Sequence, residues 1–193
     1  NIDNIVADAI AQGLALELDR VGLFGSGEDP EPLGLYNTVG VQKIDLGENG
    51  GEIKNYDIFS EAVELVENVN GTANALLWSP RTAGTIDRYK DGTGQPLVAP
   101  ESFKKLSKFS TNQIPNNMVK GTANDATCVF VGAWRNLFVG MRRNIVLEVS
   151  RTAAGAFENL QVVIRAYLRA DYVVAKPEQF VIIDGIIPEA PTP

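Results

Sequence analysis

The stretch LQVVIRAYLRADYVV, residues 160–174, decides the fold that the sequence predicts. Apolar, small or aromatic side chains fill its even-numbered positions, and polar or charged side chains fill most of the odd-numbered ones. A period of two residues is typical of a β-strand with one covered face. Alanine, leucine and arginine also favour helices, but the period does not fit a helix. We therefore predict one strand of roughly 50 Å, at about 3.3 Å per residue.

A strand of this length needs equally long partners, since an ordinary strand has about five or six residues. The final third of the chain offers three shorter strand-like runs, CVFVGAW, LFVGM and IVLEVS. None of them matches the long strand, so we expect its partners to come from sequence upstream of Asn1 or from other subunits. Without those partners, the chain should expose a sheet edge near residues 152–176 and dimerise or lose order there.

A long helix of roughly 35 Å, at about 1.5 Å per residue, is predicted for residues 2–24. Apolar or small residues recur there at spacings of three and four, which places them on one helix face. They are Ile2, Ile5, Val6, Ala9, Ile10, Gly13, Leu14, Leu18 and Val21. The pattern is already under way at Ile2, and the chain opens on Asn1 rather than Met. We therefore expect the helix to begin in sequence upstream.

The stretch GSGEDPEPLGL, residues 25–35, carries a G-x-G pattern that raises the question of phosphate binding. Phosphate loops precede a helix, whereas this one follows a helix, where the dipole is negative. Glu28, Asp29 and Glu31 add three further negative charges. We therefore predict a glycine C-cap followed by helix-stopping prolines.

The middle of the chain predicts alternating short helices and strands. Asp57 is placed to cap a helix that Asn70-Gly71 ends, and Ser79-Pro80 is placed to open a second helix. The other predicted elements are a strand around residues 39–46, a buried strand at ALLW (75–78), an end of the second helix before DGTGQP (91–96) and a disordered tail at 188–193.

The residue types offer little for catalysis or metal binding. The chain of 193 residues has no histidine, the commonest general base and zinc ligand, and its single cysteine, Cys128, lies in an apolar run that predicts burial. Ser102 and Lys105 match the S-x-x-K motif of penicillin-recognising enzymes, but without the accompanying S-D-N and K-T-G motifs. Glu61 and Glu64 lie on a predicted exposed helix face. We therefore assign no catalytic residue, no cofactor site and no metal ligand.

Charge is unevenly distributed along the chain. Residues 1–70 hold 14 acidic and 3 basic side chains, net −11, and residues 71–193 hold 10 acidic and 14 basic ones, net +4. One interpretation is an acidic helical layer beside a basic sheet; the other is head-to-tail association of acidic and basic halves. The total of −7 argues against a nucleic-acid binder, which needs a concentrated basic face. No apolar run approaches the roughly 20 residues that cross a bilayer, so no membrane partner is expected.

Four segments resemble, in the same order, the major capsid proteins of tailed bacteriophages. They are GLALELDRVGLFGSGEDPEPLGL (13–35), LLWSPRTAGTIDRYKDGTGQPL (76–97), VGAWRNLFVGMRRNIVLEVSR (131–151) and VVIRAYLRADYVVAKPEQFVII (162–183). The resemblance implies an α+β capsid fold, shared with encapsulin shells. It has a peripheral domain, built of a spine helix and long β-strands, and an axial domain, built of a mixed sheet flanked by helices. The implied ranges are 1–38 and 152–177 for the peripheral domain, 39–151 and 178–187 for the axial domain, and 188–193 for a tail.

The resemblance also implies a function. The chain would be a non-enzymatic structural subunit of an icosahedral phage or prophage capsid. It would self-assemble in the bacterial host cytoplasm into hexamers and pentamers that enclose DNA, with a scaffold, a maturation protease and a portal as further partners. An encapsulin-type shell protein stays open as an alternative, as does a small hydrolase with a Ser–Lys or carboxylate site.

Two expectations concern individual residues. Some members of the family cross-link their subunits between a lysine and an asparagine, assisted by a glutamate. These last two positions align with Leu160 and Tyr167, while Asn159 is one position away and points to the other face of a strand. We therefore predict no cross-linking.

Four arginines are our candidates for salt bridges between subunits, and the alternative for them is solvated charge on a sheet face. They are Arg142, Arg143, Arg165 and Arg169.

Overall fold

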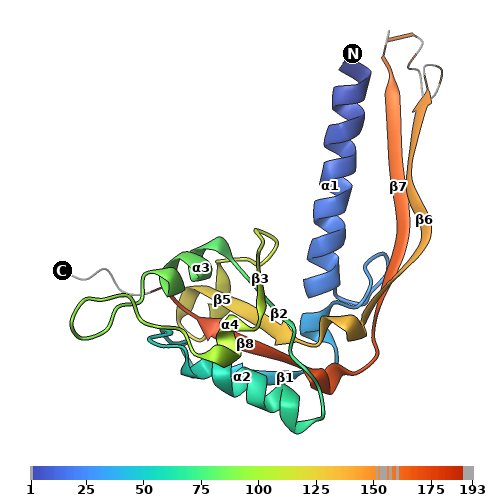
Figure 1. Cartoon of the computed structure of the whole chain (residues 1–193). Helices are drawn as coiled ribbons and strands as arrows, with labels where there is room; N and C mark the ends of the chain where they lie inside the picture. Colours follow the sequence, from blue (N-terminus) through green and yellow to red (C-terminus); the bar gives the residue numbers. More distant parts are fainter. Residues whose placement is uncertain (1, 151, 153–155, 157, 160, 189–193) are drawn as a thin grey trace. The chain divides into compact units, whose positions relative to one another are not determined.

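The computed structural model of the chain describes all residues except 1, 151, 153–155, 157, 160 and 189–193 (Figure 1). It divides into two compact units. We call Asn1–Gly34 with Val139–Val173 the helix–hairpin unit, and Leu35–Phe138 with Val174–Pro193 the sheet unit. Each is described by itself.

The helix–hairpin unit is built from one long helix and two long strands. Helix α1 (Ile2–Phe24) confirms the predicted helix. Strands β6 (Leu137–Ser150) and β7 (Val163–Val174) form a two-stranded sheet. Strand β7 confirms the predicted long strand over 163–174, whereas Gln161 and Val162 lie before its start and Leu160 lies outside the described residues. Side-chain contacts such as Arg143 to Tyr167 and Glu148 to Arg165 show that the strands run antiparallel.

The expectation that β7 has no long partner within the chain is wrong. Strand β6 is one strand of 14 residues, whereas the sequence suggested two short strands separated by Arg142, Arg143 and Asn144. Polar side chains do not interrupt this strand, because most of its residues are exposed and no apolar face is required. Because β6 pairs with β7, residues 139–150 group with the helix–hairpin unit, while the peripheral and axial ranges, including 39–151, stay a prediction.

The turn after α1 folds back on itself. The Gly25 N–H donates to the Val21 carbonyl at 2.8 Å, and the Gly34 N–H donates to the Gly25 carbonyl at 2.9 Å. A Cβ on Gly25 would lie 2.1 Å from the Pro32 carbonyl oxygen, so close backbone approach requires this glycine. Gly27, with φ of 78°, takes the left-handed conformation of the turn. The helix ends at Phe24, as predicted, and the N–H groups of Gly25 and Gly34 are hydrogen-bonded within the helix end and its turn.

The sheet unit contains a six-stranded mixed sheet in the order β1-β8-β5-β2-β3, with β4 paired to β5. Strand β1 runs parallel to β8 and β2 parallel to β3, while β5 is antiparallel to β2, β4 and β8. The strands are β1 (Gln42–Asp45), β2 (Ala75–Trp78), β3 (Ser107–Ser110), β4 (Met118–Lys120), β5 (Ala123–Gly132) and β8 (Phe180–Ile186). The helices are α2 (Asp57–Asn68), α3 (Pro80–Asp87), α4 (Glu101–Lys104) and the 3-10 turns Leu35–Asn37, Trp134–Asn136 and Pro177–Gln179.

The core of the sheet unit lies between the sheet and α2. This helix buries Phe59, Ala62, Val63 and Val66 and exposes its acidic side chains, which is the pattern of a helix on a sheet. Phe59 lies in an aromatic cluster in which the ring centroids of Trp78 and Phe103 are 6.2 and 5.1 Å away. The strands contribute Leu76, Val129, Val131, Val181 and Ile183 to the same core. Cys128 is fully buried, as predicted.

Of the two predicted helix caps, Ser79 is confirmed and Asp57 is wrong. Ser79 caps α3 by accepting a hydrogen bond from the Thr82 N–H, with Pro80 in the first turn. Asp57 is not the cap of α2, because it already lies in the first turn and Tyr56 occupies the cap position without a side-chain bond. The Asn55 side chain instead accepts a bond from the Asp57 N–H.

Candidate assembly surface

Side chains alternate between the two faces of β7. The even-numbered residues face α1: the Tyr172 hydroxyl donates to the Leu18 carbonyl at 2.9 Å, and Leu168 lines a hollow together with α1. The odd-numbered face carries Arg165, Tyr167 and Arg169. The alternation therefore places half-buried side chains at the even-numbered positions 166–174, whereas Ile164 is exposed, and puts the arginines on the other face.

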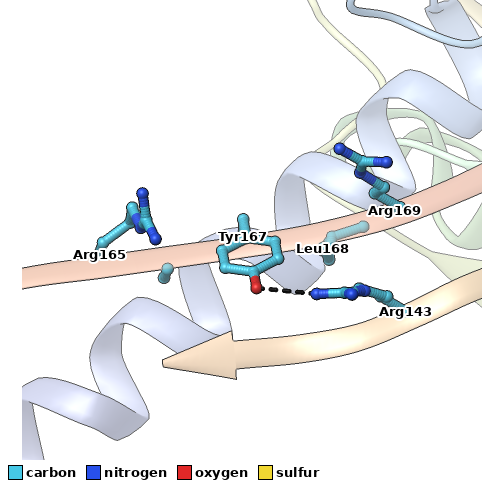
Figure 2. A pocket seen from close by; sticks show the side chains of 6 residues that line it. Arg143, Arg165, Tyr167, Leu168 and Arg169 are labelled. Carbon is cyan, nitrogen blue, oxygen red and sulfur yellow. Dashed lines mark hydrogen bonds between the residues drawn. The ribbon is translucent and has the colours of Figure 1, made fainter. Parts of the chain in front are cut away.

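The basic face forms a hollow of about 500 Å³, shown in Figure 2. Its lining is Arg143 of β6 and Arg165, Ala166, Tyr167, Leu168 and Arg169 of β7. Arg143 Nη1 donates to the Tyr167 hydroxyl at 3.0 Å, across the two strands. Arg165 Nε donates to Glu148 Oε2 at 3.0 Å, and this bond raises the pKa of the arginine. Two of the three guanidinium groups are therefore held by partners within the hairpin.

Positive charge exceeds negative charge on this hairpin. The described strands β6 and β7 hold four arginines but only two acids, Glu148 and Asp171. The side chains of Arg142 and Arg169 are exposed and make no hydrogen bond or ion pair within the described residues. An exposed guanidinium without a partner can bind a carboxylate of another molecule in a bidentate manner.

Apolar side chains are exposed beside these charges. Val139 and Met141 are 50% and 49% exposed, and Val149 is 63% exposed. Exposed apolar surface rimmed by charged groups is typical of a protein–protein interface. The hairpin therefore offers both apolar area and charge for association.

The predicted arginines are partly brought together. Arg143, Arg165 and Arg169 line one hollow, whereas Arg142 is exposed on β6 outside that lining. Their place at a subunit contact stays a prediction. Glu148 was missed by sequence reasoning, because its pairing with Arg165 needs the hairpin register that the sequence did not reveal.

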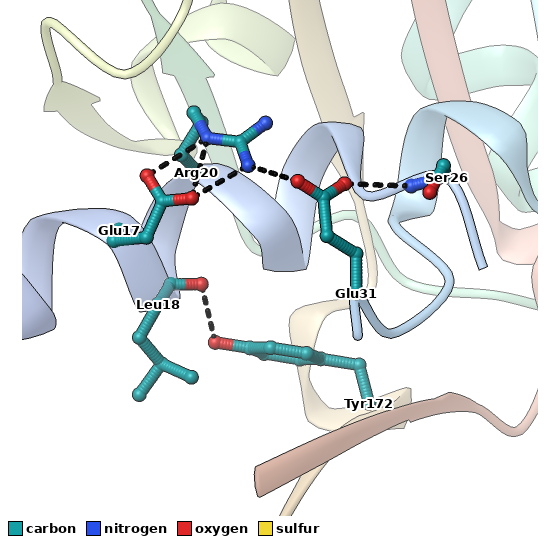
Figure 3. Close-up of polar contacts among 6 residues, drawn as sticks. All are labelled: Glu17, Leu18, Arg20, Ser26, Glu31 and Tyr172. Atoms are coloured by element: carbon teal, nitrogen blue, oxygen red, sulfur yellow. Dashed lines mark hydrogen bonds and ion pairs between the residues drawn. The ribbon is translucent and has the colours of Figure 1, made fainter. Parts of the chain in front are cut away.

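A second charged cluster ties α1 to its turn (Figure 3). Arg20 Nη2 lies 2.6 Å from both Glu17 Oε1 and Glu31 Oε1, and Glu31 Oε2 accepts from the Ser26 N–H at 3.3 Å. Arg20 lowers the pKa of both carboxyl groups through these hydrogen bonds. The three-residue spacing of Glu17 and Arg20 in a helix is the one sequence signal for this cluster.

Tyr172 fixes the strand against the helix in the same view. A Cβ on Gly22 would lie 2.6 Å from Cζ of the Tyr172 ring, so the ring occupies space that only glycine leaves free. Burial, together with the charge of Asp19, raises the pKa of Tyr172 to about 12. The hydroxyl therefore stays protonated and continues to donate to the Leu18 carbonyl.

A charged cluster in the sheet unit joins the partly exposed Lys120 to the exposed Asp45 and the buried Asp184. Lys120 Nζ lies 2.8 Å from Asp45 Oδ2 and 3.0 Å from Asp184 Oδ2, and the Tyr36 hydroxyl donates to Asp184 Oδ1 at 3.3 Å. The lysine lowers the pKa of Asp45, and its charge offsets the desolvation of Asp184, which is 8% exposed. Within the described part of the chain, no three metal-ligating side chains gather. This cluster joins β1, β4 and β8.

The S-x-x-K motif does not form a nucleophile pair. The Ser102 hydroxyl lies 3.1 Å from the Ser60 hydroxyl, on α2. Lys105 is exposed and makes no side-chain hydrogen bond or ion pair among the residues that the structure describes. No described helix is long and apolar enough to cross a membrane.

Comparisons with known proteins found similar sequences and similar structures. The chain is 24% identical over 180 residues to a major capsid protein of Halomonas phage phiHAP-1. The aligned part makes up 93% of this chain and 28% of that protein. The structure of the capsid of an empty GTA particle is similar to the chain, with a TM-score of 0.72 and 17% sequence identity. The similar part makes up 96% of this chain and 66% of the GTA capsid chain. A structure from Mycobacterium phage Adephagia is similar over the whole of this chain and over 66% of the phage chain, with a TM-score of 0.71 and 15% sequence identity. A virus-like particle from Pyrococcus furiosus is similar over 88% of this chain and 64% of the particle's chain, with a TM-score of 0.60 and 15% sequence identity.

The structural matches show the α+β capsid fold, and the chain spans less than two thirds of these relatives. The model of the phage capsid family matches residues 1–185, which is nearly the whole sequence. The chain therefore belongs to the phage capsid family.

Proposed function

We propose that the chain is a structural part of the shell subunit of a phage or prophage capsid. The observation that carries the proposal is the match of the phage capsid family model to residues 1–185. The subunit self-assembles into hexamers and pentamers that enclose DNA.

The helix–hairpin unit supplies the contact surface in this proposal. Burial of Val139, Met141 and Val149 against a neighbouring subunit provides the driving force, which grows with apolar area removed from water. The arginines of the hairpin provide register, because charge complementarity fixes orientation more than it adds affinity. Arg142, Arg143, Arg165 and Arg169 are the residues that we place at subunit contacts.

The two units have different places in the proposed shell. The helix–hairpin unit corresponds to the peripheral part and the sheet unit to the axial part near the centre of a capsomer. Assembly takes place in the bacterial host cytoplasm, and a scaffold, a maturation protease and a portal act on the complete protein. The proposed function is structural rather than enzymatic, and the match to the phage capsid family supports this.

An encapsulin-type shell is the second candidate. The similarity to the virus-like particle from Pyrococcus furiosus supports it, because that particle shares the fold. The greater TM-scores of the phage and GTA structures favour the phage capsid.

Electron microscopy of the full-length protein that contains this chain tests the proposal. Expressed alone or with its scaffold, the protein should form closed shells of uniform diameter. Persistent monomers under all conditions of concentration and salt would contradict it.

A further inference from the structure

One face of β7 forms an open basic site, which we call the arginine face. Arg165, Tyr167 and Arg169 occupy alternate positions of the strand, so their side chains share this face. Arg143 of β6 joins them by donating to the Tyr167 hydroxyl at 3.0 Å. The two β7 arginines lie to either side of Tyr167 (Figure 2) and, at about 3.3 Å per residue, are roughly 13 Å apart along the strand. The hollow of about 500 Å³ that these arginines line is open to a row of negative charges.

The hairpin neutralises the arginine face only in part. Glu148 holds Arg165, but the two side chains of this ion pair are 45% and 71% exposed, and exposed ion pairs are weak. Asp171 accepts a hydrogen bond from the Tyr172 N–H. The Arg169 side chain makes no hydrogen bond or ion pair within the described residues. The face therefore has a free guanidinium for the carboxylate of another molecule.

Helix α2 of the sheet unit carries a matching row of acids. It has no lysine or arginine, and its exposed acidic side chains are three or four residues apart, at Asp57, Glu61, Glu64 and Glu67. At about 1.5 Å per residue these four positions extend over about 15 Å, close to the spacing of the arginines. The last three carboxylates make no hydrogen bond or ion pair within the part of the chain that the structure describes.

This row of acids is unfavourable in a single copy. Like charges at this spacing repel one another on a helix. Glu67 also lies in the last turn of α2, where the helix dipole is negative and where no basic residue compensates it. A row of cations from another molecule relieves both effects, and every copy of the chain carries such a row on its hairpin.

We propose that the arginine face of one copy binds the acidic face of α2 in the next copy, with Arg169 and Glu64 as the central ion pair. The inference rests on the proposed shell function and names the partner of the arginine face. The contact joins two different surfaces, so it is head-to-tail and closes into rings when the rotation permits. Rings of five and six copies are the assemblies that the proposed function requires.

Charge reversal in the full-length protein tests the pairing. Arg169→Glu and Glu64→Lys each place like charges opposite one another, and each should lower the yield of shells by about tenfold or more. The double variant, Arg169→Glu with Glu64→Lys, restores opposite charges and should return the yield to within about threefold of the unchanged protein. Shell yield is measured by sedimentation and electron microscopy, and circular dichroism confirms that each variant is folded. Glu64→Lys relieves repulsion within α2, so a loss of shells in this variant would not come from a weaker helix.

Matched controls separate pairing from net charge. Arg169→Glu with Glu48→Lys has the same net charge as the double variant, but Glu48 is exposed in the sheet unit outside α2. Arg169→Glu with Asp29→Lys places the new cation in the turn after α1, where Asp29 is exposed. Both controls should assemble as poorly as Arg169→Glu alone.

Three results would overturn the inference while leaving the shell function intact. They are single reversals without effect, a double variant no better than the single ones, and equal rescue by either control; rescue by Asp29→Lys alone would assign the arginine face to the turn after α1. If the unchanged protein forms no shells, the proposed function fails, and the inference fails with it.

Discussion

Gly22 decides whether α1 can lie against the ring of Tyr172. Replacing it by alanine puts a Cβ 2.6 Å from the ring, which must shift and weaken its bond to the Leu18 carbonyl. Overpacking costs about 1–3 kcal/mol, and the better helix propensity of alanine offsets about 1 kcal/mol. Thermal unfolding of the Gly22→Ala variant, followed by circular dichroism, should therefore show a net loss of stability.

Gly13 provides the control for this substitution. It lies in the same helix, and a Cβ there has no atom within 4 Å. Gly13→Ala should raise stability by about 0.5–1 kcal/mol, from helix propensity alone. Equal stabilisation by both alanines would mean that Tyr172 does not pack on Gly22.

The cluster of Arg20 with Glu17 and Glu31 predicts a dependence on pH. Both carboxyl groups have a folded-state pKa below the ordinary value of 4.5 because of hydrogen bonds from Arg20. Their contribution to stability is therefore complete above about pH 4.5 and is lost as the pH falls through the lowered pKa values. Arg20→Gln should lower the urea midpoint at pH 7 and have a much smaller effect at pH 3.

The exposed Arg88 on the sheet unit is the charge-matched control, because its side chain has no partner within the described residues. Arg88→Gln should change the urea midpoint little at either pH. An effect of Arg20→Gln that is equally large at pH 3 would contradict the role of the carboxylates.

At the scale of elements, α2 is held by its buried face. Phe59 is fully buried among the rings of Trp78 and Phe103. Phe59→Ala should lower the free energy of unfolding by about 3–5 kcal/mol, from lost transfer energy and the cavity left behind. Phe109, 56% exposed on β3, is the matched control, and its replacement by alanine should cost less than about 0.5 kcal/mol. A similar loss in the free energy of unfolding for Phe59→Ala and Phe109→Ala would mean that Phe59 does not lie in the core.

Elements with a clear period were predictable, and their pairing was not. The alternation of 160–174 predicted β7, and the spacing of three and four predicted α1, because apolar side chains recur with the period of each element. Strand β6 lacks such a pattern, since Arg142, Arg143 and Asn144 lie exposed in its middle. Its length, its register with β7 and the Glu148–Arg165 pair depend on contacts that no local pattern encodes. The predicted cap of α2 was wrong because the helix begins one residue earlier, with Tyr56 at the cap position and the Asp57 N–H bonded to the Asn55 side chain.

At the scale of the whole molecule, the sequence revealed the charge asymmetry but not the surfaces on which it acts. The 14 acids against 3 bases in residues 1–70 suggested either an acidic helical layer beside a basic sheet or head-to-tail association. The structure places Glu17, Asp29 and Glu31 beside the hollow between α1, its turn and β7, and it puts the arginines on the antiparallel hairpin of β6 and β7. A single copy leaves both surfaces exposed, which is the arrangement that the proposed assembly needs.

Cryo-electron microscopy of shells formed by the full-length protein tests the central claim most directly. The account predicts closed shells of hexamers and pentamers in which the fold of this chain fits the density and the hairpin of β6 and β7 is buried against a neighbouring copy. Shells in which the hairpin faces solvent, with Arg142, Arg143, Arg165 and Arg169 far from any other subunit, would contradict it, as would a protein that never assembles.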